Sequence, residues 1–81
     1  MATVFIPSGL RALTAGETRV EIDARDVREL ITRLDERYPG FREQLGNAVA
    51  VAIDGEIIQD PLLEPVEPGS EVHFMPPISG G

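Results

Sequence analysis

A single amphipathic helix between Asp26 and the breaker pair Pro39-Gly40 constrains the fold of this 81-residue chain more than any other sequence feature. Its apolar side chains recur with the spacing of one helix face. They are Val27, Leu30, Ile31, Leu34 and Tyr38. Asp26 followed by Glu29 fits a capping box, in which both side chains accept hydrogen bonds from free backbone N–H groups. One such helix has to cover one face of a sheet, because the chain offers nothing else to cover it.

Five segments have the length and residue pattern of short β-strands. They are residues 3–7, 17–22, 48–53, 56–58 and 71–75. Residues 17–22 alternate apolar and charged side chains, which is typical of a strand with one buried face. Residues 48–53 are an almost continuous run of small apolar side chains, which predicts a strand buried on both faces. Asp54-Gly55 predicts a tight hairpin turn after that run.

The remaining segments are predicted to be loops and one short turn. Residues 8–16 form a loop that contains glycine, so the first two strands are expected to pair as a hairpin. Residues 60–68 contain three prolines and should be irregular. The apolar anchors expected in that segment are Leu62, Leu63 and Val66. Residues 41–45 fit one further helical turn that packs under the end of the main helix.

The order of elements is strand, strand, helix, strand, short strand, strand. If the first and last strands are neighbours at the centre of the sheet, they run parallel and the helix supplies the crossover. This is the β-grasp layout, an α+β fold in which one main helix covers a mixed sheet of four to five strands. The predicted organisation is one β-grasp domain over residues 1–75 and a flexible tail over residues 76–81.

Composition excludes several classes of function. A net charge of −7 disfavours binding to nucleic acid, whose phosphates it would repel. No run approaches the roughly 20 apolar residues that span a bilayer, and the first residues do not form a signal peptide, so we expect a soluble cytoplasmic protein. The chain has no cysteine and no lysine, which rules out thiolate ligands, Schiff bases and self-conjugation through a lysine. His73 is the only histidine and has no evident serine partner, and no metal-ligand spacing occurs. We therefore expect neither a side-chain catalytic site nor a metal site.

The tail carries the remaining candidate for chemistry. Pro76-Pro77 predicts an extended exit from the sheet, and the last four residues could reach roughly 13 Å beyond it. Gly80-Gly81 leaves the terminal carboxylate free of neighbouring side chains, so that an attacking group can approach its carbonyl closely. A chain ends in two glycines by chance about once in 200. Combined with the β-grasp order and the inert side chains, the pair points to the Gly81 carboxylate as the reacting group.

The whole chain resembles the small ubiquitin-like sulfur-carrier proteins, meaning the molybdopterin synthase small subunit and the thiamine thiazole sulfur carrier. The segments that carry the resemblance are Ile6-Pro7 with residues 10–13, residues 27–39, residues 51–55 and, most specifically, the ending over residues 68–81. Two positions depart from the family pattern. Ser70 stands where members commonly have aspartate, and Met75 stands where a second aromatic residue is usual, although a thioether still fills an apolar pocket.

The resemblance implies a mechanism and a set of partners. An adenylyltransferase of the ubiquitin-activating type would use ATP and magnesium to adenylate Gly81, and a persulfide would then leave a thiocarboxylate there. The chain itself would bind no cofactor and no metal. Partner contacts are implied for a surface and for the tail. They are Phe5, Arg11, Phe74, Met75, Pro76, Pro77, Ile78 and Ser79. Phe5 and Phe74 also fit plain core positions, and Arg11 also fits a solvated loop.

Several recipients of the sulfur remain open at this point. The length and the ending favour molybdopterin, with the large subunit of molybdopterin synthase as the accepting partner. Cysteine, thiamine thiazole, a thiolated tRNA and a secondary metabolite are the alternatives within the same class. A protein modifier conjugated through Gly81 to lysines of other proteins would use the same adenylation. The third possible class of function is a β-grasp interaction module whose sequence ends in Gly-Gly by chance.

Overall fold

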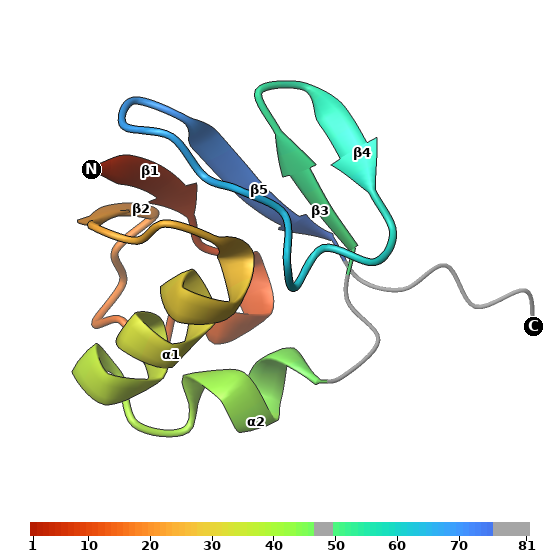
Figure 1. The fold of residues 1–81 in the computed structure, drawn as a ribbon. Helices are drawn as coiled ribbons and strands as arrows, with labels where there is room; N and C mark the ends of the chain where they lie inside the picture. Colours follow the sequence, from red (N-terminus) through yellow and green to blue (C-terminus); the bar gives the residue numbers. More distant parts are fainter. Residues whose placement is uncertain (47–49, 76–81) are drawn as a thin grey trace, which may run out of the picture.

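The computed structural model describes residues 1–46 and 50–75, which form a five-stranded sheet with its helices on one side (Figure 1). The elements in chain order are β1 (Ala2–Phe5), the 3₁₀ turn η1 (Ser8–Leu10), β2 (Arg19–Ile22), α1 (Val27–Arg37), α2 (Phe41–Leu45), β3 (Ala50–Ile53), β4 (Glu56–Ile58) and β5 (Glu71–Met75). The prediction for residues 47–49 lies outside the described residues. Within residues 1–46 and 50–75, every predicted helix and strand is present, although some of them begin or end at other residues than predicted.

The strand order is β2-β1-β5-β3-β4. The central strands β1 and β5 are parallel, and the other three pairs are antiparallel. The first and last strands are thus neighbours, which confirms the predicted β-grasp fold of the α+β class. In Figure 1, α1 and α2 lie below the sheet and leave its opposite face uncovered.

The start of α1 follows the predicted capping pattern, with one difference. Asp26 is the N-cap, and its Oδ1 accepts a hydrogen bond of 2.8 Å from the backbone N–H of Glu29. The Glu29 side chain in turn accepts a 2.9 Å bond from the N–H of Arg25, the residue before the cap, rather than from Asp26. A side-chain cap of this kind stabilises a helix by about 1 kcal/mol.

The segment over residues 60–68 supplies the other partners of the first turn of α1. The N–H of Val27 donates to the carbonyl of Glu64 at 3.1 Å, and the N–H of Arg28 donates to that of Leu62 at 2.9 Å. Val66 is buried as predicted, but Leu62 is 48% exposed and Leu63 78% exposed. The prediction that these two leucines anchor the segment is therefore wrong, because backbone hydrogen bonds to the helix hold it instead.

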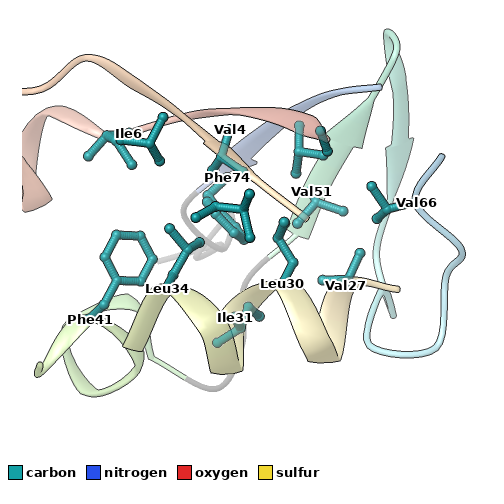
Figure 2. Packing of buried hydrophobic residues seen from close by; sticks show 14 of the residues in the cluster. Val4, Ile6, Val27, Leu30, Ile31, Leu34, Phe41, Val51, Val66 and Phe74 are labelled. Atoms are coloured by element: carbon teal, nitrogen blue, oxygen red, sulfur yellow. The ribbon is translucent and has the colours of Figure 1, made fainter. Parts of the chain in front are cut away.

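The core lies between α1 and the covered face of the sheet (Figure 2). Leu30 and Leu34 project from α1 toward Val4 of β1 and Val51 of β3, and all four are fully buried. Burying a side chain of this size contributes about 1.5–3 kcal/mol. In β3 only Val51 is fully buried, so the prediction of a strand buried on both faces is wrong. The prediction failed because α1 and α2 cover only one face of the sheet. Ala50 and Ala52 point toward the opposite, uncovered face, which we call the bare face.

Candidate functional site at the end of β5

The last strand carries the chain to the edge of the described structure. Val72 and Phe74 of β5 point into the core, whereas Glu71 and His73 are exposed on the bare face. Met75 is half-buried and pairs in register with Ala50 of β3. The candidate residues of the tail lie outside the described residues. They are Pro76, Pro77, Ile78, Ser79, Gly80 and Gly81.

An aromatic stack marks the bare face of the sheet beside this exit. Phe5 of β1 lies opposite His73 of β5 in the parallel register. Their ring centroids are 4.1 Å apart, and the ring planes differ by only 5°. Phe5 is half-buried and His73 is exposed, so Phe5 is not an interior core residue. Sequence reasoning identified Phe5 but not the stack, because the pairing joins strands nearly 70 residues apart.

Phe74 has the opposite environment. It is 7% exposed and meets Phe41 of α2 edge-on, with centroids 6.0 Å apart and an interplanar angle of 61°. Such an arrangement is favourable because the positive edge of one ring meets the negative face of the other. Phe74 thus belongs to the core, as one of the two roles considered for it requires.

A groove of about 330 Å³ opens beside the end of β5. It is bounded by η1, by the end of α2 and by the last two residues of β5. Its lining residues are Pro7, Ser8, Gly9, Leu10, Gln44, Leu45, Phe74 and Met75. The groove is thus mainly apolar and adjoins the point at which the chain leaves the sheet. A concave apolar surface with a few polar groups is typical of a binding site.

Arg11 follows η1 directly and is exposed. Its carbonyl accepts hydrogen bonds from the N–H of Gly16 at 2.8 Å and from the hydroxyl of Thr14 at 3.2 Å. Thr14 is 1% exposed, and its hydroxyl also bonds to the carbonyl of Glu17 at 3.0 Å. Thr14 therefore fixes the loop that presents the Arg11 side chain. Nothing in the local sequence distinguishes it, because a buried threonine in a loop has no pattern of its own.

Ser70, the position that departs from the family pattern, is buried in the turn before β5. Its Oγ accepts a 3.2 Å hydrogen bond from the N–H of Glu67. A short polar side chain is needed there, and serine supplies it as aspartate would. Among the described residues, no group of three or more His, Asp or Glu side chains could hold a metal ion. Within the same residues no helix has the length and apolar character needed to cross a bilayer.

Comparisons with known proteins agree with this architecture. The model of the ThiS family matches residues 4–81. The molybdopterin synthase sulfur carrier subunit of Pyrenophora tritici-repentis is 33% identical over 57 residues, which are 67% of this chain and 61% of that protein. The match thus spans about six-tenths of the length of that curated relative.

Two solved structures share the fold over nearly the whole chain. A chain in the crystal structure of the Amycolatopsis orientalis BexX/CysO complex superposes with a TM-score of 0.86 at 28% identity, covering 100% of both chains. Mycobacterium tuberculosis CysO superposes with a TM-score of 0.85 at 24% identity, covering 96% of this chain and 100% of the other. These ubiquitin-like neighbours agree with the β-grasp topology of the sheet.

Proposed function

The chain belongs to the ThiS family, and from that premise we propose that it is a sulfur carrier whose Gly81 carboxylate is converted to a thiocarboxylate. The observation that carries the proposal is the family match over residues 4–81, which runs from β1 through Gly80-Gly81. The curated relative, named as a sulfur carrier subunit, supports it. The absence of cysteine, lysine and a second histidine from the sequence leaves the backbone carboxylate as the group best suited to the chemistry.

The proposed reaction begins with activation of a poor electrophile. A carboxylate oxygen of Gly81 attacks the α-phosphorus of ATP in the active site of an adenylating enzyme, and pyrophosphate leaves. The terminal sulfur of a persulfide on the partner then attacks the acyl carbon and expels AMP. A thiol reduces the resulting acyl disulfide, which forms a protein disulfide and releases the thiocarboxylate. ATP and magnesium act within the partner enzyme.

Docking of the partner is proposed for the two surfaces beside the exit from β5. One is the Phe5–His73 stack on the bare face, and the other is the groove between η1 and α2, which Met75 helps to line. Arg11 directly follows η1, whose residues line the groove. The complex of CysO with BexX is a precedent for assembly of a structurally similar chain with a partner protein.

The test is mass spectrometry after incubation with an adenylating enzyme, MgATP and a persulfide donor. The thiocarboxylate adds about 16 Da, as would oxidation of Met1 or Met75 to the sulfoxide. Iodoacetamide separates the two, because the chain has no cysteine and the thiocarboxylate is the group that it alkylates. We expect ATP-dependent alkylation of the C-terminal peptide and none after deletion of Gly81. Equal alkylation with and without Gly81 would contradict the proposal.

For the recipient, we propose the pterin substrate of molybdopterin synthase. The name of the curated relative is the observation that favours it. The thiocarboxylated chain, mixed with the large subunit of that enzyme and the sulfur-free pterin precursor, is expected to lose its sulfur to the pterin. The control is a cysteine synthase with an activated serine as acceptor. Transfer to that acceptor alone would assign the carrier to cysteine formation, and amide-linked adducts on other proteins would indicate a modifier.

A further inference from the structure

On the bare face of the sheet, side chains of similar charge lie in rows that run across the strands. Strand register places five exposed or half-buried residues in one line across all five strands. In spatial order they are Arg19 (β2), Phe5 (β1), His73 (β5), Ala52 (β3) and Ile57 (β4). We call this line the aromatic row. It contains a guanidinium, an imidazole and no carboxylate, on a chain whose net charge is −7.

The neighbouring line, two residues along each strand, has the opposite character. Thr3 of β1 lies opposite Glu21 of β2 on one side and opposite Glu71 of β5 on the other. Asp54, at the end of β3, extends the line, because its Oδ1 accepts a 2.9 Å hydrogen bond from the N–H of Glu71. We call this the acidic row. On the other side of the aromatic row, Met75 and Ala50 form an uncharged pair toward the exit of the chain.

Arg19 and His73 of the aromatic row are both available to a partner. The one ion pair among residues 1–46 and 50–75 joins Arg25 to Glu29, so Arg19 forms no ion pair within those residues. His73 is exposed, and its ring lies flat on Phe5 at a centroid distance of 4.1 Å. Arg19 and His73 flank Phe5 on adjacent strands, about 10 Å apart at the backbone. A long arginine side chain and an imidazole can reach one carboxylate across that distance.

We propose that Arg19 and His73 together bind an acidic side chain of the adenylating enzyme over the Phe5 ring, an inference that rests on the proposed function. The acidic row then faces a basic group of the same enzyme. Reversed docking would set carboxylate against carboxylate, which is strongly unfavourable in an interface. The order of the acidic row, the aromatic row and the uncharged pair Met75 and Ala50 therefore fixes the orientation of the partner, with this pair and the exit from β5 toward its active site.

The first experiment measures steady-state ATP–pyrophosphate exchange with the full chain and an adenylating enzyme that accepts it. Arg19→Glu is compared with Arg33→Glu on the exposed face of α1. Each variant takes the net charge from −7 to −9, so both weaken general attraction to the same extent. We expect Arg19→Glu to raise KM about tenfold with kcat nearly unchanged, and Arg33→Glu to raise KM less than about twofold. Equal effects of the two variants would overturn the inference.

The second experiment isolates the imidazole. His73→Phe keeps a ring on Phe5 but removes both imidazole nitrogens, and with them the N–H donor that would bind the acidic side chain. The charged groups nearest to it on this face are Arg19 on β2 and Glu71 on its own strand, and β1 and β3 contribute none in its row. We expect His73→Phe to raise KM about threefold with kcat nearly unchanged. An unchanged KM would exclude His73.

Failure of the two proposals gives different results. If the wild-type chain supports no exchange with any adenylating enzyme, the sulfur-carrier function is wrong and this inference with it. If the wild type is adenylated but Arg19→Glu behaves like Arg33→Glu, the carrier function stands and only the docking orientation is wrong. Thermal unfolding of each variant confirms that it is folded, which is expected because Arg19, Arg33 and His73 are all exposed.

Discussion

The Phe74→Leu substitution removes the ring that meets Phe41 edge-on beneath the groove. Truncation of a well-packed ring to leucine costs about 1–2 kcal/mol, because the lost contacts are only partly replaced. The edge-to-face geometry of the pair adds about 1 kcal/mol. A chain of 81 residues has a total stability of about 4–12 kcal/mol, so the loss is readily measured. Phe41→Leu removes the same pair from the other side and should cost a similar amount.

A double-mutant cycle in urea tests this, followed by far-UV circular dichroism because the chain has no tryptophan. We expect each single variant to lose about 2 kcal/mol and the double variant to lose about 1 kcal/mol less than the two losses added together. Strict additivity would refute the pair interaction. A large rise in KM with unchanged stability would instead make Phe74 a docking residue.

Three further substitutions test single features of the fold. Asp26→Ala removes the cap of α1 and should lower the free energy of unfolding by about 1 kcal/mol in urea titration, whereas an unchanged midpoint would show that the bonds from residues 60–68 suffice. Gly55→Ala forces a side chain onto a φ of 88° in the β3–β4 turn and should cost about 1–2 kcal/mol, with Gly9→Ala as a control outside the left-handed region. Thr14→Val leaves the Arg11 and Glu17 carbonyls without their side-chain donor and should cost about 1–3 kcal/mol in thermal unfolding.

The parts of the fold that local pattern determines were predictable from the sequence. The apolar stripe of α1 and its Asp26 cap depend on residues within one or two turns of each other. Asp54-Gly55 forms the predicted hairpin turn, with both residues at positive φ. The parallel pairing of β1 with β5 was also predictable, because a short chain with one main helix has few other ways to arrange its strands in one sheet.

The errors arose where burial depends on distant elements. The alanines of β3 look like buried residues in the sequence, but neither α1 nor α2, the two α-helices of the described residues, covers the second face of the sheet. Leu62 and Leu63 look like anchors, yet the segment is tied by its carbonyls to the first turn of α1. The Phe5–His73 stack needs a register between strands far apart in the chain, which no local period contains. The pairing of Phe5 with His73 was therefore not predictable from the sequence, although Phe5 itself was named as a surface residue.

The alternation of β5 explains why one strand can serve both stability and recognition. Val72 and Phe74 point into the core, and Glu71 and His73 point to the bare face, so each face can be varied without disturbing the other. Because β5 pairs with β1 on one side and β3 on the other, its register is fixed from both sides. A slip of one residue would bury His73 and expose Phe74, and this is strongly disfavoured. The core thus determines which side chains a partner meets and the residue at which the chain leaves the sheet.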